Sequence, residues 1–319
     1  MRIPIYASMQ RIPGGIMLVP LILGSLLRTF APEFLDLGSF TTGLFKNGAT
    51  PLIALLILAT GAQITVRQST AVLIKSGVVL TAKTIIPGLM IVALGKVFGL
   101  DGVLGISLLA WMTAFTNSNG GLWVALASEY GDEADSGAYI ASALDDGPFF
   151  PLLLLGLSGL GDIPAVAVIA AVIPFVIGII WGNLDEKFQQ VMKPVPDIVI
   201  PFFALSLGAG IDLKSLATGG LTGILLGLLV PFITGGLCYL AYRFVLREKT
   251  GVGWASGTVA GNAVATPAVV VAADAAFAPY QAVATAQVAA AVLVSAIVAS
   301  LLTAYFSKRY RQVTAGPAA

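Results

Sequence analysis

Long apolar stretches separated by short polar segments make up most of this chain. Ten of these stretches are long enough to cross a bilayer as helices, which takes roughly 20 mostly apolar residues. They lie near residues 14–30, 49–66, 70–96, 102–128, 137–160, 163–183, 197–213, 215–244, 252–274 and 279–306. The pattern predicts an all-α polytopic membrane protein with ten transmembrane helices, which we number as spans one to ten.

The composition supports this prediction. The chain has 319 residues, of which 57% are hydrophobic and 10% are charged, whereas about a quarter of the residues in a soluble domain are charged. Polar side chains are therefore too few to cover the protein in water, and we expect the lipid bilayer to be its main surroundings.

Charge and residue types argue against several classes of function. The net charge of +1 produces no strong field that would attract nucleic acid. The chain has no histidine and one cysteine, which excludes disulfides within the chain, zinc sites and Ser–His–Asp or Cys–His catalysis. We therefore expect neither an enzyme nor a protein with a metal or organic cofactor, and carboxylates are left to carry any proton chemistry.

Lysine and arginine are distributed unevenly over the two sides that ten spans define. With the N-terminus inside, Arg28, Lys46, Lys96 and Lys214 fall outside, Lys83 falls within a span, and the remaining 12 of the 17 fall inside. Cytoplasmic loops carry an excess of such residues. The distribution predicts that both termini are cytoplasmic.

The two halves of the chain resemble each other. The stretch "PLIALLILATGAQI" from Pro51 matches "PFFALSLGAGIDL" from Pro201, and further matches follow in the same order in corresponding spans. Because each half has an odd number of spans, the second half must be inserted upside down. The sequence thus predicts two inverted five-helix repeats, residues 1–160 and 161–319, an arrangement typical of secondary transporters.

Spans four and nine carry polar interruptions at matching positions. Pro267 cannot continue the preceding helix, whereas Thr266 would cap a new one. The glycine pair after Asn119 likewise allows one helix to end and a new one to begin in span four. Two half-helix N-termini near the membrane midplane would form an anion site, unless the polar side chains only satisfy each other between packed helices. The candidate substrate-binding residues here are Thr116, Asn117, Ser118, Asn119, Gly120, Gly121, Asn262 and Thr266.

Several ionisable or polar side chains stand in or beside apolar spans. Asp145 and Asp146 are candidates for binding a coupling proton, with Na⁺ as the alternative ion and a wetted helix end as the alternative location. Lys83 would pair with one of these aspartates or bind a substrate carboxylate. Gln63 and Asp212 would line a cavity or be solvated at loop ends.

Small residues recur every fourth position in spans eight and ten. Such faces allow helices to approach closely in a membrane, so we expect spans eight and ten to make close helix contacts through these residues. The residues are Gly219, Gly223 and Gly227 in one span and Ala282, Ala286 and Ala290 in the other.

A set of motifs resembles those of the bacterial 2-keto-3-deoxygluconate permease family over nearly the whole chain. The motifs are "RIPGGIMLVPL" (11–21), "NGGLW" (119–123), "LDDGP" (144–148), "GNLD" (182–185), "IPFFALSLGAGIDL" (200–213) and "AVATP" (263–267). The resemblance implies proton-coupled uptake of a sugar-acid anion across the bacterial inner membrane. The family pattern has an acid and then often a small residue before Gly-Pro, which favours Asp145 over Asp146 as the coupling acid.

The wider relatives that this resemblance suggests, bile-acid symporters and sodium–proton antiporters, have broken helices that cross in spans four and nine. The resemblance therefore implies that spans 3–5 and 8–10 form a moving transport core and that spans 1, 2, 6 and 7 form the scaffold. The expected function is import of 2-keto-3-deoxygluconate or a related sugar acid by proton symport with alternating access.

Other functions stay open at this point. A sodium-coupled organic-anion symporter and a channel would fit the same spans. An intramembrane aspartyl protease would use Asp145 or Asp146 together with Asp162 of "GLGD". The oligomeric state is also open, with a homodimer as one alternative.

Overall fold

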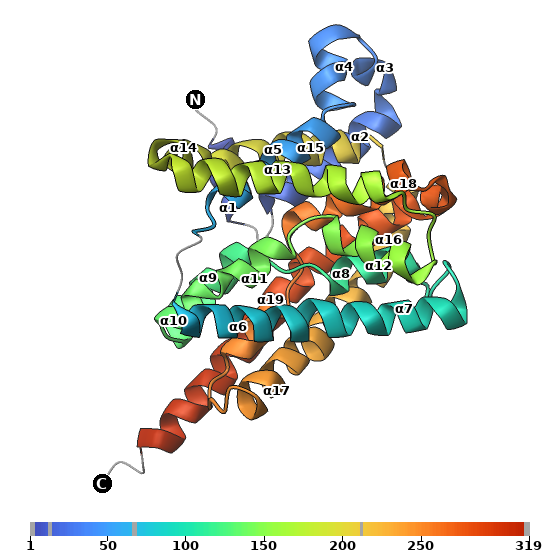
Figure 1. Ribbon diagram of the computed structural model, residues 1–319. Coiled ribbons are helices and arrows are strands. Elements are labelled where there is room, and N and C mark those ends of the chain that lie inside the picture. The colour runs from blue at the N-terminus through green and yellow to red at the C-terminus, as the bar shows by residue number, and fades with distance from the viewer. Residues whose placement is uncertain (1–3, 12–14, 66–68, 211–212, 316–319) are drawn as a thin grey trace.

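The computed structural model describes residues 4–11, 15–65, 69–210 and 213–315 (Figure 1). Of these described residues, 81% are helical. The described residues form no strand, and their one β pairing is an isolated bridge between Val103 and Ile106. The prediction of an all-α protein is confirmed.

Helices follow one another along the whole chain with short connections. The first half contains α1 (Ile5–Gln10), α2 (Gly15–Phe30), α3 (Pro32–Leu35), α4 (Ser39–Phe45), α5 (Ala49–Ala62), α6 (Thr70–Leu80), η1 (Thr81–Ile85), α7 (Ile86–Phe98), α8 (Leu108–Phe115), α9 (Gly120–Tyr130), α10 (Glu133–Gly137), α11 (Tyr139–Leu144) and α12 (Phe149–Ser158). The second half contains α13 (Ala165–Leu184), α14 (Glu186–Met192), α15 (Val195–Gly208), α16 (Leu213–Val230), η2 (Pro231–Gly235), α17 (Gly236–Phe244), η3 (Val252–Ser256), η4 (Gly261–Ala265), α18 (Thr266–Ala273), η5 (Ala275–Tyr280) and α19 (Gln281–Ala315).

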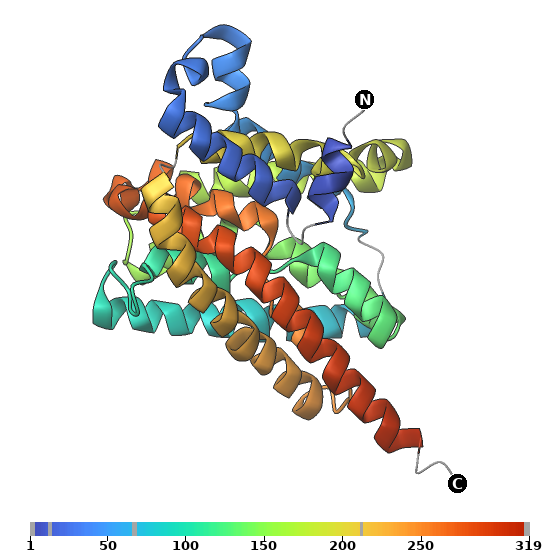
Figure 2. The ribbon, with the colours of Figure 1, turned by 180° about the vertical axis from the view of Figure 1, so that it is seen from behind.

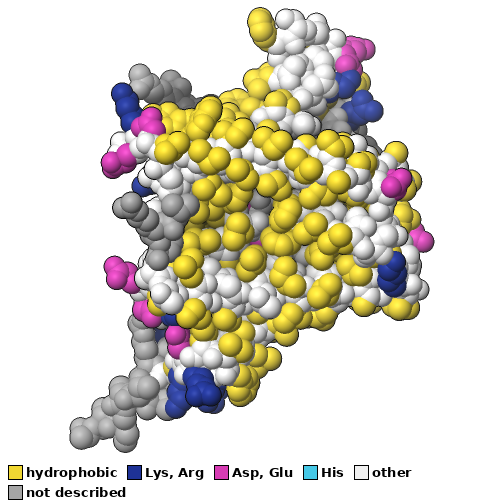
Figure 3. Space-filling view, in the orientation of Figure 1, with side chains coloured by type: hydrophobic (Ala, Val, Ile, Leu, Met, Phe, Trp, Pro, Cys, Tyr) yellow, Lys and Arg dark blue, Asp and Glu magenta, His cyan; other side chains and the backbone are white. Residues whose placement is uncertain are grey.

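The membrane character of the helices is clear from length and composition. Among the described residues, five helical stretches are long and apolar enough to cross a bilayer, or up to eight if each of three bent pairs counts as one span. The remaining two expected spans correspond to α2 and to the interrupted pair α8 and α9. Charged side chains gather at two opposite ends of the face in Figure 3, with a mainly hydrophobic band between them. The count of ten and the inverted repeats stay predictions.

Helices α2, α5, α13 and α15 pack together in the upper part of Figure 1. Their contacts run backbone to backbone at glycines. A Cβ atom added to Gly208 would lie 2.0 Å from the carbonyl oxygen of Leu21, and one added to Gly178 would lie 2.1 Å from that of Leu58. Only glycine permits this approach, so these positions fix how α15 meets α2 and how α13 meets α5.

Helices α16 and α19 lie side by side along much of their length (Figure 2). A Cβ atom on Gly219 would lie 2.6 Å from that of Ala286, and one on Gly223 would lie 2.8 Å from that of Ala290. The expected packing of small residues between spans eight and ten is confirmed.

Two long helices contain a π-helical turn near their middle, η1 in the third span and η2 in the eighth. Proline explains both positions. Pro87 has no N–H group to donate to the carbonyl of Lys83, and Pro231 has none for that of Gly227. The backbone widens by one residue at each place, so that the N–H of Ile86 bonds the carbonyl of Thr81. Such turns occur frequently at functional sites.

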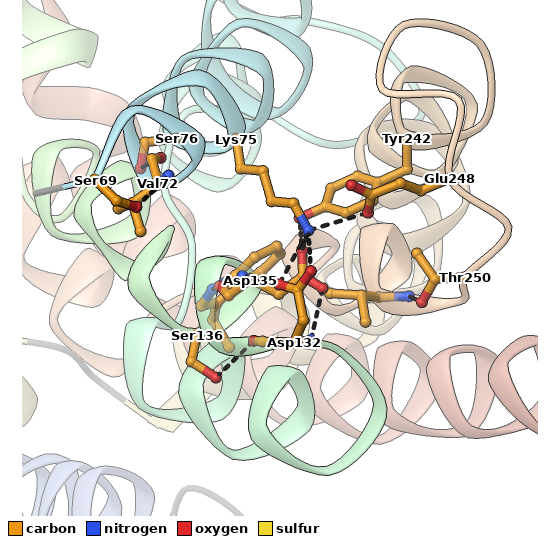
Figure 4. A network of polar contacts seen from close by, with 12 residues as sticks. Ser69, Val72, Lys75, Ser76, Asp132, Asp135, Ser136, Tyr242, Glu248 and Thr250 are labelled. Atoms are coloured by element: carbon orange, nitrogen blue, oxygen red, sulfur yellow. Dashed lines mark hydrogen bonds and ion pairs between the residues drawn. The ribbon is translucent and has the colours of Figure 1, made fainter.

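An ion-pair network around the buried Lys75 and Asp135 connects α6, α10 and the segment after α17 (Figure 4). The Nζ atom of Lys75 lies 3.0 Å from Asp132, 2.7 Å from Asp135 and 3.0 Å from Glu248. The hydroxyl of Tyr242 also donates to Asp135, over 2.9 Å. The network fixes the ends of three elements against each other.

Candidate functional site

The fourth span is interrupted where the sequence predicted. Helix α8 ends at Phe115, and α9 begins at Gly120 after four non-helical residues. The side chain of Asn119 accepts a hydrogen bond from the N–H of Leu122 over 3.0 Å and caps the new helix. A Cβ atom on Gly120 would lie 2.5 Å from the ring of Tyr139, so glycine allows α11 to approach this helix start.

The ninth span is also interrupted, but the second helix starts differently from the prediction. Short 3₁₀ helices η3 and η4 flank non-helical residues 257–260, and α18 begins at Thr266 with Pro267 in its first turn. Ala265 occupies the N-cap, and the Thr266 hydroxyl has no hydrogen-bond partner. The prediction that Thr266 caps this helix is wrong, because η4 leads into α18 without the extended residue that a capping side chain requires.

A third interruption separates α11 from α12, and it contains the acidic pair. The two helices bend by 56° at this point. Gly147 has a φ of 114°, a backbone conformation that residues with a Cβ atom rarely adopt. Pro148 occupies the N-cap of α12. The glycine and proline that follow the aspartates therefore place both carboxylates at a helix break.

Asp145 is 2% exposed and its carboxylate is fully engaged by neighbouring groups. Thr84 of η1 donates its hydroxyl to Oδ2 over 2.8 Å. Ser118 donates its backbone N–H to Oδ1 over 3.1 Å and its hydroxyl to the same atom over 2.8 Å. Asp145 therefore connects the third, fourth and fifth spans from a position without contact to solvent.

Asn117 connects the same region to the ninth span. Its side-chain amide donates to the carbonyl of Asp145 over 3.2 Å, and its side-chain oxygen accepts from the N–H of Ala260 over 3.1 Å. Nearby, the N–H of Asn119 donates to the hydroxyl of Thr258 over 2.9 Å. The breaks in spans four, five and nine thus satisfy one another's backbone groups.

Lys83 of η1 has no exposed surface. Its ammonium donates to the carbonyl of Ala114 over 3.3 Å and to the hydroxyl of Thr234 over 3.1 Å. The charge of Asp145 interacts with it, but no ion pair joins it to either aspartate among the described residues. The direct pairing that the sequence suggested is not observed.

Asp146 lines a cavity of about 370 Å³ beside this buried centre. Its Oδ1 atom has no hydrogen-bond partner, and neither has the side-chain oxygen of Asn262, which is 8% exposed. Further lining comes from Asn119, Gly120 and Gly121 at the start of α9. The two unpartnered oxygens leave hydrogen-bonding capacity for an occupant.

The cavity lies between the packed helices α2, α5 and α15 and the three interrupted spans. The other lining residues are Ile16, Met17, Leu56, Thr60, Tyr139, Ser142, Pro196, Asp197, Ile200, Ala260, Gly261 and Val292. No Lys or Arg occurs among these described lining residues. The lining includes the first turn of α15, which follows α14, and Tyr139 at the start of α11, which follows α10, so the cavity extends toward the end of the bundle where α14 and α10 are found, at the left in Figure 1.

The remaining candidate residues do not line this cavity. Thr116 is fully buried, and its hydroxyl donates to the carbonyl of Met112 over 2.7 Å. Gln63 donates its side-chain amide to the carbonyl of Gln189 over 3.0 Å, which joins α5 to α14. Asp212 lies outside the described residues.

Sequence reasoning did not single out Asp197, Thr60 or Tyr139 as site residues. Asp197 stands in the first turn of α15, where an acid normally interacts with the helix dipole. Its position at the cavity therefore has no distinct sequence signal.

Apolar helices around a polar cavity, with interrupted helices beside it, define a membrane transport protein in structural terms. A family model for 2-keto-3-deoxygluconate permeases matches residues 6–312. The 2-keto-3-deoxygluconate permease 1 of Salmonella typhimurium is 42% identical over 303 residues, which cover 95% of each chain. The 2-keto-3-deoxygluconate permease of Xanthomonas axonopodis pv. citri is 38% identical over 311 residues, 96% of this chain and 98% of that protein.

The chain belongs to the 2-keto-3-deoxygluconate permease family. The resemblance drawn from its motifs is thus confirmed. Membership indicates a membrane transporter rather than an enzyme, so the protease alternative with Asp162 is set aside.

Proposed function

We propose that this protein imports 2-keto-3-deoxygluconate or a closely related sugar-acid anion with protons, by alternating access across the bacterial inner membrane. One observation carries the proposal beyond family membership. The start of α9 and the carboxylate of Asp146 line the same cavity, so an anion and a coupling ion would be bound side by side.

The start of α9 supplies the anion-binding part of this site. The first N–H groups of a helix have no partner within the helix, and the aligned peptide dipoles place roughly half a positive charge there. The side chain of Asn119 already accepts from the N–H of Leu122, so the N–H groups of Gly120 and Gly121 are the ones left for an anion. The unpartnered oxygen of Asn262 is suited to accept a hydrogen bond from a sugar hydroxyl.

Asp146 is the better candidate for the exchanging proton, although the family pattern favoured Asp145. The Asp146 carboxylate faces the cavity, whereas Asp145 is enclosed by Thr84 and Ser118. A monovalent anion that enters a cell is opposed by about 2.3 kcal/mol per 100 mV. One proton on Asp146 cancels this term, and a second proton would add driving force.

The proposal includes ten spans in two inverted repeats, with both termini cytoplasmic. Helices α2, α5, α13 and α15 form the scaffold, and the interrupted spans and their neighbours form the moving core. The cavity lies toward the end that carries α10 and α14, so it faces the cytoplasm in this orientation. No change of oligomeric state is required, and a homodimer would contact through surfaces outside the cavity.

Transport by the purified full-length protein in proteoliposomes tests the proposal. The wild type should exchange labelled for unlabelled 2-keto-3-deoxygluconate and should accumulate it when a pH gradient is imposed. Asp146→Asn should keep exchange but lose accumulation, because the side chain can no longer gain or lose a proton. Asp145→Asn, the matched variant, should lower both activities through damage to the buried contacts.

Each contrary outcome has a separate meaning. Absence of exchange in the wild type would refute the substrate class. Accumulation driven by a Na⁺ gradient alone would favour the sodium-coupled alternative. Full pH-driven accumulation by Asp146→Asn would show that another group carries the proton.

A further inference from the structure

Lys83 lies in surroundings that resemble the coordination shell of a metal cation. Its ammonium contacts two oxygen atoms, the Ala114 carbonyl and the Thr234 hydroxyl. Both are neutral oxygen donors of the kind that hard cations take. The side chain has no exposed surface, so this cation is a permanent part of the protein.

The charges around this position are negative. Ala114 belongs to the last turn of α8, whose final carbonyls have no partner within the helix and carry the negative end of the helix dipole. The carboxylate of Asp145, when ionised, adds a negative charge that interacts with Lys83. Interrupted membrane helices bind sodium ions with such half-helix C-terminal ends and unwound carbonyls.

The two π-helical turns bring these groups together. Lys83 and Thr84 stand on η1, and Thr234 stands on η2. Lys83 contacts the end of α8 and η2, while Thr84 contacts Asp145. The ammonium therefore contacts oxygen atoms of spans four and eight, while Asp145 of span five lies beyond ion-pair distance.

We propose that the ammonium of Lys83 takes the place of a coupling sodium ion at the end of α8. This inference rests on the proposed function in one respect only: the sodium ion that Lys83 replaces is called a coupling ion. Transport by the wild type is then independent of Na⁺, and the exchanging ion binds elsewhere. Removal of the Lys83 side chain leaves Asp145 and the α8 carbonyls without a cation, and Na⁺ enters in its place.

The geometry gives Na⁺ room to enter after this substitution. Lys83→Ala removes four non-hydrogen atoms, which opens space for about one ion and one or two waters. The Ala114 carbonyl and the Thr234 hydroxyl would supply its protein oxygens, waters would complete its shell, and Asp145 would balance its charge from beyond ion-pair distance. Without Na⁺, the buried carboxylate of Asp145 would have no opposite charge.

Thermal unfolding of the purified full-length protein in detergent tests the inference without any transport measurement. Lys83→Ala should be stabilised by NaCl relative to choline chloride at equal ionic strength, with a rise in Tm of about 2–4 °C or more. The wild type should show no such specific rise. Lys83→Arg keeps the positive charge, and Lys96→Ala removes an exposed lysine from the same span, so both should behave as the wild type.

Transport provides the second measurement. Uptake or exchange by Lys83→Ala should be about tenfold faster in NaCl than in choline chloride, and that of the wild type should not change. The milder variant Lys83→Gln is used if Lys83→Ala cannot be purified in either salt. The inference is refuted if the purified variant shows no Na⁺-specific effect on Tm or transport.

The two proposals can fail separately. If the wild type moves no sugar acid, the transport proposal is wrong, yet the Na⁺-specific rise in Tm of the Lys83 variant still decides the cation site. If the wild type itself requires Na⁺ at this site, the inference is wrong even though transport occurs.

Discussion

Asn117 donates its side-chain amide to the backbone carbonyl of Asp145 over 3.2 Å, across the crossing of two interrupted helices. Its side-chain oxygen simultaneously accepts from the N–H of Ala260 in the third interruption. Because Asn117 is fully buried, water cannot replace either bond. One amide thus holds together the three helix interruptions in spans four, five and nine.

Substitution of Asn117 should therefore impair both stability and transport. Asn117→Ala leaves a buried N–H and a buried carbonyl without partners, each of which costs about 1–3 kcal/mol. We expect a Tm lower by several degrees and exchange slower by about tenfold or more. Thermal unfolding and counterflow in proteoliposomes measure the two effects.

The exposed Asn47, between α4 and α5, provides the matched control for this variant. Asn47→Ala should resemble the wild type in both assays. An Asn117→Ala protein with wild-type Tm and wild-type exchange would show that the three breaks are held by other contacts.

Gly223 offers a test of the packing between α16 and α19. Its Cβ atom would lie 2.4 Å from the carbonyl oxygen of Gln287. Gly223→Val should therefore push the helices apart and cost about 1–3 kcal/mol or more. Gly220 stands on the same helix with nothing within 4 Å of an added Cβ atom, so Gly220→Ala should keep or slightly raise the Tm. Equal decreases of Tm in the two variants would contradict the close packing of α16 and α19.

The network around Lys75 predicts a dependence of stability on pH (Figure 4). Partial burial alone would raise the pKa of Asp132. Hydrogen bonds from the Asp135 backbone N–H and from the Lys75 ammonium outweigh this effect, so the pKa of Asp132 is lower than its ordinary value of 3.8. A carboxyl group whose pKa is lower in the folded state than in the unfolded state contributes its full stabilisation at pH values above the unfolded-state pKa. The contribution is lost as the pH falls below 3.8 and through the folded-state pKa.

Unfolding of the purified protein between neutral and acidic pH measures this contribution. Because Asp132 is largely exposed, we expect about 0.5–1 kcal/mol. Asp132→Asn should be less stable at neutral pH and should lose less stability on acidification. Lys249→Gln removes a neighbouring lysine outside the network and should retain the wild-type profile. An unchanged profile in Asp132→Asn would assign the acid sensitivity to other groups.

Asp197 should weaken the binding of anions to the cavity. It is exposed at the start of α15 and lines the side opposite the interrupted helices. Exposed charges interact with about 0.2–1 kcal/mol, so Asp197→Asn should raise the affinity for 2-keto-3-deoxygluconate by up to about fivefold. Glu186→Gln on α14 is the control. Isothermal titration calorimetry at low and high salt measures the affinity. Weaker binding by Asp197→Asn would indicate a direct contact with substrate hydroxyls.

Much of the fold follows from local sequence signals. Runs of apolar residues give the helices, and the small residues of spans eight and ten give their contact. The glycine pair after Asn119 marks a helix start because Asn caps well and glycine permits an irregular approach. The π-helical turns at Thr81 and Pro231 were not predicted, since proline alone does not distinguish a widened turn from a kink.

The site was only partly predictable for a similar reason. The sequence identifies the acidic pair, but neighbours on a helix point about 100° apart, and the 56° bend decides which one meets the cavity. One of the two partners of Lys83 is the backbone carbonyl of Ala114, a group that every residue type offers. Contacts to backbone groups therefore leave no mark in the sequence.

The cavity has two acidic residues and, among its described lining residues, no basic one. Under the proposed mechanism, an anion enters when Asp146 is neutral. Once Asp146 ionises, two like charges about 4 Å apart repel by about 4 kcal/mol at an effective dielectric constant of about 20. The same carboxylate that admits the sugar acid outside would expel it in the more alkaline interior and resist its return, which biases delivery inward for as long as the pH gradient lasts.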